Sequence, residues 1–200
     1  MKVMIVTTPI RPVPSGFPPF GSLALIKYLR KNGVNDVEFY NIDGNRPGYE
    51  DVLAHIGSRK PDVLGISAVV STAYEYTKRL ALDVKTMSPE TLIVLGGNLG
   101  ASANVLLTRA GIDLVALGES ERIIVNLVER ARETRSPPEF KDIPGLALLD
   151  ADGTLVNTGY EAQLPGEELY DIDWEDLERS SNMDLFFPNI DINAAGLDHL

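Results

Sequence analysis

Hydroxyl residues, paired glycines and acidic residues follow several apolar runs in this chain of 200 residues. The hydroxyls of Ser67, Ser71 and Thr72 can hydrogen-bond an amide or phosphate edge of a ligand. The adjacent Gly96 and Gly97 admit positive φ and the close approach of another group. Gathered in one place, these residue types favour the binding of a small molecule.

Each feature also has a purely structural interpretation. Ser71 or Thr72 can cap the helix that follows, and the glycine pair can form a tight turn without a ligand. Glu119 or Glu121 can interact favourably with the positive end of a helix dipole. Residue types alone leave both interpretations open.

The spacing of apolar residues predicts the elements that must position these groups. Continuous β-branched runs are typical of buried parallel strands, and a period of 3.6 residues is typical of helices. The predicted strands are 2–7, 36–42, 62–67, 91–97 and 113–118, and the predicted helices are 22–33, 49–60, 73–87, 101–111 and 121–135. The alternation predicts an α/β fold with a doubly wound, five-stranded parallel sheet, flavodoxin-like or Rossmann-like, in the order 2-1-3-4-5.

The ligand crevice of such a sheet lies beyond the carboxyl ends of the strands, where the strand order reverses. Here that point falls between the first and third strands. The loops expected to meet there are 8–21, 67–73, 96–101 and 118–121. The first of these loops contains five prolines, together with Phe17, so we expect it to be stiff and partly apolar.

The pattern changes after Arg135. Residues 136–144 read as a linker, and residues 145–159 predict a hairpin that turns at Asp152 and Gly153. The segment 163–200 is acidic and punctuated by proline, with little periodicity. It predicts either a connector to a further domain or a partly ordered tail.

Composition disfavours several classes of protein. A net charge of -11 argues against nucleic acid as a partner. The chain has no cysteine, so disulfides and thiolate metal sites are excluded, and His55 and His199 are its two histidines. The N-terminal apolar run is too short for a signal peptide or a membrane span, so we expect a cytoplasmic protein without a membrane span.

Common nucleotide-binding motifs are missing as well. Neither GxGxxG after the first strand nor GxxxxGK(S/T) occurs in the sequence. A response-regulator receiver domain would need acidic residues where Thr7, Thr8 and Ser67 stand. These classes are therefore disfavoured even though their topology fits.

Four segments in order resemble the cobalamin (vitamin B12)-binding domain at the N-terminus of cobalamin-dependent radical SAM enzymes. That group includes the magnesium-protoporphyrin IX monomethyl ester cyclases. The segments are TTPI…PPFGSLALIKYLRKNG, PDVLGISAVVSTAYEYTKRLA, TLIVLGGNLGAS and DLVALGESE. The resemblance covers residues 1–135, and the hairpin with the acidic stretch around Trp174 is similar to the connector that leads into the radical SAM barrel in this family.

The resemblance implies a site for a corrinoid whose nucleotide tail is drawn away from cobalt into the crevice. Phe17 and Phe20 would either cover the lower face of the corrin or pack under the first helix. We also expect that a bulky side chain at Gly97 would block the slot while leaving the fold largely intact. The implied cofactor contacts are Thr8, Pro9, Ser67, Val69, Ser71, Thr72, Gly96, Gly97, Asn98, Gly118 and Glu119.

Two departures from related patterns matter. Methyltransferase domains of this kind carry DxHxxG after the first strand, whereas this loop has no histidine, so cobalt would lack a protein imidazole. His55 falls in a predicted helix away from the crevice and reads as a surface residue. The CxxxCxxC motif that holds a 4Fe-4S cluster in the radical enzymes is absent too, so cluster ligands cannot come from this chain.

The resemblance predicts two parts, a cobalamin-binding domain over 1–135 and a hairpin with an acidic connector over 136–200. Alone the chain would bind cobalamin without catalysis. With a radical SAM domain in cis, S-adenosylmethionine and a 4Fe-4S cluster, the parent would be a methyltransferase or cyclase. The alternatives are a flavodoxin-like protein that binds a mononucleotide and an interaction module without a ligand.

Overall fold

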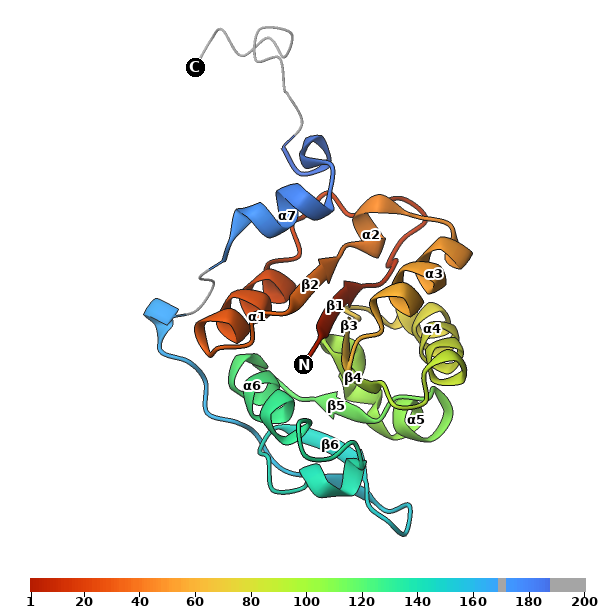
Figure 1. The fold of residues 1–200 in the computed structure, drawn as a ribbon, viewed down its shortest axis with the longest axis vertical. Helices are drawn as coiled ribbons and strands as arrows, with labels where there is room; N and C mark the ends of the chain where they lie inside the picture. The colour runs from red at the N-terminus through yellow and green to blue at the C-terminus, as the bar shows by residue number, and fades with distance from the viewer. Residues whose placement is uncertain (169–171, 188–200) are drawn as a thin grey trace, which may run out of the picture.

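The architecture is a single mixed sheet covered by helices on both faces (Figure 1). A computed structural model describes residues 1–168 and 172–187. The sheet runs in the order β2-β1-β3-β4-β5-β6-β7. Its strands are β1 (Val3–Thr7), β2 (Val37–Tyr40), β3 (Val63–Ser67), β4 (Leu92–Gly96), β5 (Leu114–Ala116), β6 (Leu146–Leu149) and β7 (Leu155–Asn157). The first five are parallel in the predicted order 2-1-3-4-5, which confirms the fold class.

The helices lie on the two faces of this sheet, with α1 and α6 on one face and α3, α4 and α5 on the other (Figure 1). Two short helices, α2 and α7, were not predicted. The helices are α1 (Phe20–Lys31), α2 (Ile42–Asn45), α3 (Tyr49–Arg59), α4 (Tyr74–Met87), α5 (Ala103–Arg109), α6 (Glu121–Arg130) and α7 (Trp174–Ser180). The 3₁₀ turns are η1 (Ser71–Ala73), η2 (Asn98–Ser102), η3 (Pro137–Phe140), η4 (Gly166–Glu168) and η5 (Met183–Leu185).

Strand β1 shows why the apolar runs are continuous. Val3 and Ile5 belong to the core beneath α1 and α6, whereas Met4 and Val6 belong to the core beneath α3, α4 and α5. Successive side chains of a strand point to opposite faces, so a strand between two helical layers must be apolar at every position. All five residues of β1 are buried.

The predicted hairpin extends the parallel sheet. Strand β6 pairs antiparallel with β5 through Ala116 and Leu146, and β7 pairs antiparallel with β6. The turn closes where the Gly153 N–H donates to the Asp150 carbonyl at 2.8 Å. Because an open strand edge exposes unpaired backbone groups, β6 completes the hydrogen bonding of β5 and buries Leu148 against the core.

The acidic segment contains a helix that periodicity did not reveal. Helix α7 begins after Asp173, whose side chain accepts a hydrogen bond from the Glu175 N–H at 3.0 Å. It packs beside α1 and β2, where Leu177 is fully buried. The Arg30 guanidinium of α1 donates two hydrogen bonds to the Asp176 carboxylate, at 2.5 and 2.8 Å.

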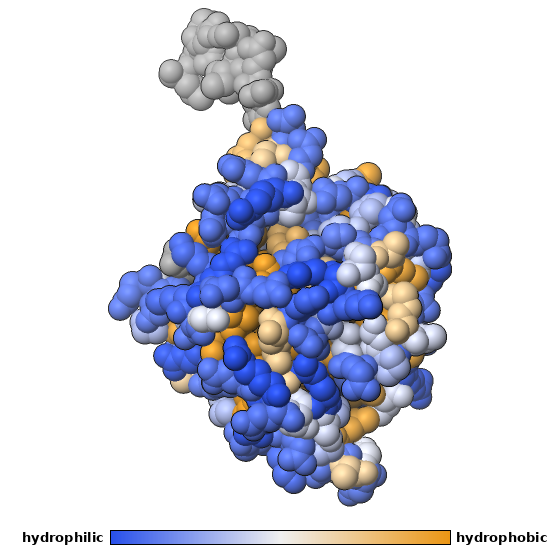
Figure 2. Space-filling view, in the orientation of Figure 1, coloured by the Kyte–Doolittle hydropathy of each residue, from blue (hydrophilic) through white to orange (hydrophobic). Residues whose placement is uncertain are grey.

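The surface on the face drawn in Figure 2 is mainly hydrophilic, with scattered apolar patches, in keeping with the acidic composition. Within residues 1–168 and 172–187, no helix has both the length and the apolar character needed to cross a bilayer.

The Arg30–Asp176 pair predicts how firmly α7 is held. Asp176→Ala would leave the partly buried Arg30 guanidinium without its carboxylate, and we expect a loss of about 1 to 3 kcal/mol in the free energy of unfolding. Limited proteolysis should then cut within or beside α7. The exposed i,i+4 pair of Glu175 and Arg179 is the matched control, and Glu175→Ala should change stability by less than about 0.5 kcal/mol. Equal effects of the two substitutions would contradict this account.

Candidate functional site

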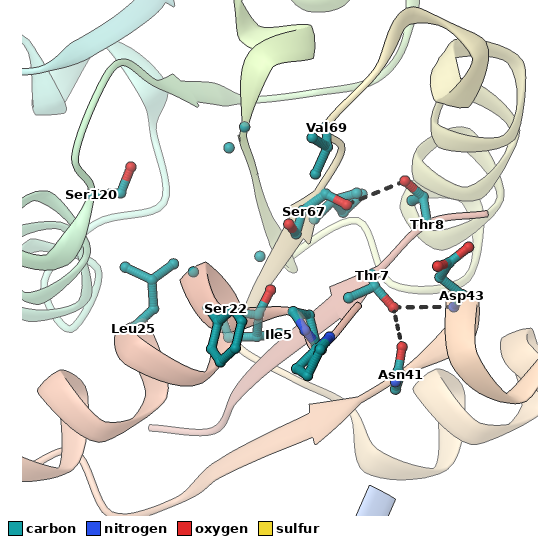
Figure 3. Close-up of a pocket in the computed structure, with 18 of the residues that line it drawn as sticks. Ile5, Thr7, Thr8, Ser22, Leu25, Asn41, Asp43, Ser67, Val69 and Ser120 are labelled. Atoms are coloured by element: carbon teal, nitrogen blue, oxygen red, sulfur yellow. Dashed lines mark hydrogen bonds between the residues drawn. The ribbon is translucent and has the colours of Figure 1, made fainter. Parts of the chain in front are cut away.

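A cavity of about 540 Å³ opens at the carboxyl ends of the parallel strands. Its floor consists of residues from β1, β3, β4 and β5. The first turns of α1 and α6 form two walls (Figure 3), and residues of the proline-rich loop 8–19 also line the cavity. The cavity therefore lies at the sheet edge where the strand order reverses, as the sequence predicts.

The structure brings most of the predicted contact residues together in this cavity. The predicted residues that line it are Thr8, Ser67, Val69, Gly96, Gly97, Gly118 and Glu119. The predicted residues outside its lining are Pro9, Ser71, Thr72 and Asn98. The four outside residues nevertheless lie in the loops and turns that border the cavity.

Ser71 and Thr72 lie in the turn η1, before α4. The cap residue of α4 is Ala73, which makes no side-chain capping bond, so neither hydroxyl plays the capping role considered above. Thr72 Oγ1 donates to the carbonyl of Ile10 at 2.9 Å and so ties this turn to the proline-rich loop. Asn98 begins the turn η2, where it is exposed.

Strand register decides which residues face the cavity. Thr7, Ser67 and Gly96 are lateral neighbours on β1, β3 and β4, and Ile5 and Gly65 are neighbours two residues below. Neighbours in register project from the same face of a sheet, here the face that carries α1 and α6. Of the two glycines among these five residues, Gly96 has open space above it, whereas a Cβ at Gly65 would lie 2.6 Å from Cδ1 of Ile5.

The adjacent glycines Gly96 and Gly97 have different roles. Gly97 has φ of 91°, and a Cβ there would lie 2.6 Å from the carbonyl oxygen of Ala68. That same oxygen accepts the Leu99 N–H at 3.1 Å. A Cβ at Gly96 would meet no atom within 4 Å. The expectation that a bulky residue at Gly97 leaves the fold largely intact is therefore wrong, because the close neighbour is backbone, and the open position is Gly96.

A carboxylate that the sequence analysis missed holds the proline-rich loop in place. Asp43 accepts hydrogen bonds from the N–H groups of Ile10 and Ser15, each at 3.2 Å. Arg46 pairs with Asp43 at 2.6 Å and donates to two carbonyls of the loop, at 2.7 and 2.8 Å. Backbone groups that strand pairing cannot satisfy are thus satisfied by α2 and its C-cap.

Thr7 and Asn41 extend this network into the buried edge of the sheet. Thr7 Oγ1 donates to Asn41 Oδ1 at 2.8 Å and accepts the Asp43 N–H at 3.1 Å (Figure 3). The signal for this network was the run NIDGNRPG, whose residue types favour side-chain-capped turns. Its first two residues were predicted as the end of the second strand, but β2 ends at Tyr40. The positions follow the strand beside β1, so they reach the same edge of the sheet.

Two residues that line the cavity each have a buried side-chain oxygen without a hydrogen-bond partner. The oxygens are Ser22 Oγ in the first turn of α1 and Glu121 Oε2 in the first turn of α6. Burial raises the pKa of the Glu121 carboxyl above its ordinary value of 4.5. The carboxylate of Glu119 raises this pKa further, while the N–H groups of Ser120 and Glu121 lower it.

The aromatic residues of the first loop lie at the mouth of the cavity. Phe17 is 75% exposed and Phe20 is 43% exposed, so neither packs under α1. The Phe20 ring meets the edge of Trp174, with 5.9 Å between ring centroids, and Trp174 in turn contacts Phe187. The connector thus contributes an apolar rim beside the cavity.

No histidine lines the cavity, and in the described part of the chain no cluster of three His, Cys, Asp or Glu residues could hold a metal ion. His55 lies on α3, with Nε2 2.5 Å from Glu38 Oε1 and its ring on Tyr40. It is a surface residue away from the cavity, as predicted. His199 lies outside the described residues.

The sheet and its cavity define a Rossmann-like domain with a cavity at the carboxyl edge of the parallel strands. The B12-binding domain family model matches residues 7–128, which is more than half of the chain. The chain therefore belongs to the B12-binding domain family, and the resemblance described from its sequence is confirmed.

Curated relatives carry this region as part of a longer protein. The chain is 29% identical over 168 residues to the anaerobic magnesium-protoporphyrin IX monomethyl ester cyclase of Rubrivivax gelatinosus, which covers 83% of the chain and 30% of the relative. It is 27% identical over 166 residues to the enzyme of the same name from Cereibacter sphaeroides, with coverage of 81% and 26%. The chain thus spans less than a third of these relatives.

Two solved structures share the fold. One is the cobalamin-dependent S-adenosylmethionine radical enzyme OxsB with aqua-cobalamin and S-adenosylmethionine bound, with a TM-score of 0.68, 17% identity and coverage of 84% of this chain and 23% of OxsB. The other is the radical S-adenosylmethionine methyltransferase TsrM from Kitasatospora setae with cobalamin and a 4Fe-4S cluster bound. Its TM-score is 0.65 at 19% identity, with coverage of 83% and 30%.

Substitutions at Gly96 and Gly97 should differ in their effect on the free energy of unfolding. We expect Gly97→Ala to lower the free energy of unfolding by about 1 to 3 kcal/mol, because the backbone there is left-handed and the new methyl meets Ala68. Gly96→Ala should change it by less than about 0.5 kcal/mol. Denaturant titration of both variants measures the difference. A Gly97→Ala variant as stable as the parent would show that the Ala68 contact is not a constraint.

The buried carboxyl of Glu121 predicts a dependence of stability on pH. Its pKa is raised in the folded state, so the free energy of unfolding falls as pH rises from the ordinary pKa through the raised one. Glu121→Gln removes this ionisation, and we expect the variant to be more stable than the parent at pH 7. The gain should disappear below about pH 4.5, where the carboxyl is protonated in both states. A gain independent of pH would contradict the assignment.

Proposed function

We propose that this chain binds cobalamin at the carboxyl edge of its sheet, with the nucleotide tail in the cavity between α1 and α6. The observation that carries the proposal is the open space over Gly96, at the switch point of a B12-binding domain. The floor of the same cavity combines apolar and glycine residues, which suit a flat ring, with the hydroxyl residues Thr7 and Ser67, which can hydrogen-bond a polar edge. These residues fit the tail of a corrinoid.

Seven of the predicted residues are proposed as direct contacts, namely Thr8, Ser67, Val69, Gly96, Gly97, Gly118 and Glu119. Pro9, Ser71, Thr72 and Asn98 would act through the loops that shape the cavity. The Thr72 bond to Ile10 supports this distinction, because it joins two of those loops. Asp43 and Arg46 are added as positioning residues, since they hold the proline-rich loop beside the cavity.

The proposed binding mode is base-off and without a histidine ligand to cobalt. The proline-rich loop offers hydroxyl, apolar and proline residues to the cavity, together with Arg11, but no imidazole. Phe17 and Phe20, which are exposed and line the mouth of the cavity, would cover an apolar face of the corrin. Cobalamin, when bound, would supply a cobalt centre that carries a methyl group or supports radical chemistry.

We further propose that the chain is the cobalamin module of a longer enzyme. Its share of the curated relatives supports this, because it matches about 30% of one and 26% of the other. A radical SAM domain in cis would provide S-adenosylmethionine chemistry and the 4Fe-4S cluster, since this chain has no cysteine. In this proposal residues 1–135 hold the cofactor and residues 136–200 lead toward that domain, in a methyltransferase or cyclase. The expected cytoplasmic location and the absence of a nucleic-acid partner stay predictions.

Corrinoid retention tests the function. Purified protein mixed with hydroxocobalamin should retain the visible corrinoid spectrum after desalting. Gly96→Leu should lower the affinity for hydroxocobalamin at least about tenfold, because the new side chain enters the open space and removes contacts worth more than about 1.4 kcal/mol. Gly57→Leu is the control, since its Cβ also meets nothing within 4 Å but lies on α3.

Circular dichroism must show an intact fold for each protein. A folded parent that keeps no corrinoid would falsify the binding proposal, and retained flavin colour would favour the mononucleotide alternative instead. Unchanged binding by folded Gly96→Leu would mean that the tail does not enter this cavity.

A further inference from the structure

The segment that contains α7 contributes a side chain to the lining of the cavity. Phe186 follows the turn η5, is 9% exposed and lines the cavity. It belongs to the same core cluster as Ile5 of β1 and Ala116 of β5, which line the cavity as well. The cavity of the α/β domain is therefore completed by residues 172–187, here called the connector segment.

A buried amide joins the connector segment to the floor of the cavity. Asn41 is 2% exposed and lines the cavity. Its Oδ1 accepts a hydrogen bond from Thr7 Oγ1, and its Nδ2 donates one to Ser181 Oγ, both at 2.8 Å. Because one end of the amide accepts and the other donates, the two bonds fix its orientation. A shift of Ser181 would therefore remove a partner from a buried group of the cavity lining.

The connector segment also contacts two other parts of the chain that line the cavity. The ring of Phe20, in the first turn of α1, meets Trp174 with 5.9 Å between ring centroids. In the proline-rich loop, a Cβ at Gly16 would lie 3.7 Å from the carbonyl oxygen of Leu185, which is ordinary van der Waals contact. The position of the segment and the shape of the cavity mouth thus depend on each other.

Few buried contacts hold the connector segment. Within residues 172–187, the buried residues are Asp176, Leu177 and Phe186. Helix α7 has seven residues, whereas an isolated helix needs about 12 to 15 to be even marginally stable. Its structure therefore depends on docking, and such segments open locally at a lower free energy than global unfolding. A ligand that packs on Phe186 would shift this equilibrium toward the docked form.

We infer that the connector segment senses cofactor occupancy: cobalamin in the cavity packs on Phe186 and strengthens the docking of α7, and docked α7 strengthens cobalamin binding by the same factor. The factors are equal because linked equilibria affect each other reciprocally. The inference rests on the proposed function and adds a regulatory coupling to it. In the proposed parent enzyme this segment leads toward the radical SAM domain, so loading of the cofactor would fix where that path begins.

Hydrogen exchange measures this coupling in the full chain. We expect saturating hydroxocobalamin to raise the protection of the α7 amides at least about fivefold, because each opening must then give up the contact between cofactor and Phe186. The amides of Asp150 and Gly153 are the internal control, since they donate hydrogen bonds at 2.8 Å in a hairpin turn that does not line the cavity. Their protection should change less than about twofold. In the free protein α7 should exchange faster than β3, as independent opening requires.

Phe186→Ala tests the residue that carries the coupling. We expect the gain in α7 protection to fall below about twofold and the affinity for hydroxocobalamin to fall about threefold or more, because the ring leaves the cavity lining. Leu185→Ala is the matched control, since Leu185 is half-buried, packs on the same core and does not line the cavity. It should loosen the segment equally with and without cofactor and keep the gain within about twofold of the parent.

Circular dichroism establishes that each variant is folded. A folded parent that retains hydroxocobalamin without extra protection of α7, or with equal extra protection of the hairpin turn, would overturn the inference and leave the proposed function standing. A full gain in folded Phe186→Ala, an equal loss of the gain in Leu185→Ala, or α7 exchange as slow as that of β3 would overturn it as well. A folded parent that retains no hydroxocobalamin would overturn the proposed function and the inference with it.

Discussion

The site depends on the hydrogen bonding between the ends of β3 and β4. Ser67 and Gly96 are in register, and beyond them the Ala68 N–H donates to the Gly96 carbonyl at 3.0 Å. The Ala68 carbonyl then accepts the Leu99 N–H, which holds the turn after β4 against β3. The left-handed backbone at Gly97 makes this turn possible. Consequently Gly96 faces open space, and the cavity exists because these two strand ends are joined.

Around this edge, separate parts of the chain are bound together. Asp43 and Arg46 hold the proline-rich loop, Thr72 holds it from the other side, and Arg30 fastens α7 through Asp176. These contacts connect residues that are far apart in sequence. The loop next to the cavity is thereby ordered before any ligand arrives, which lowers the entropic cost of binding.

The fold class followed from patterns that local physics enforces. Strands between two helical layers must be apolar on both faces, so β1 could be recognised from its run of apolar residues. The hairpin followed from Asp152 and Gly153, and the order of the parallel strands from the alternation of strands and helices. Helix α7 was not predicted because it is short and its apolar contact comes mainly from Leu177. Asp173 was nevertheless a usable signal for an N-cap.

The site could be predicted less completely. Residues next to strand ends, such as Ser67 and Gly96, were found because topology brings such ends to one edge. Asn41 and Asp43 were missed because the run NIDGNRPG after β2 indicates a side-chain-capped turn but does not by itself indicate that the turn holds the proline-rich loop. Ser22 carried no signal either, because an unpartnered hydroxyl is a property of its surroundings.

The sequence by itself determined the periodicities, the glycines and prolines, and the absence of cysteine and of a loop histidine. These properties belong to single residues or to neighbours along the chain, so they can be read without coordinates. The tertiary structure decided that Ala68 lies against Gly97, that Gly96 is open, and that Ser22 and Glu121 border the same cavity. Such facts depend on atoms that packing brings together from distant positions, and side-chain burial and hydrogen-bond satisfaction are defined only there.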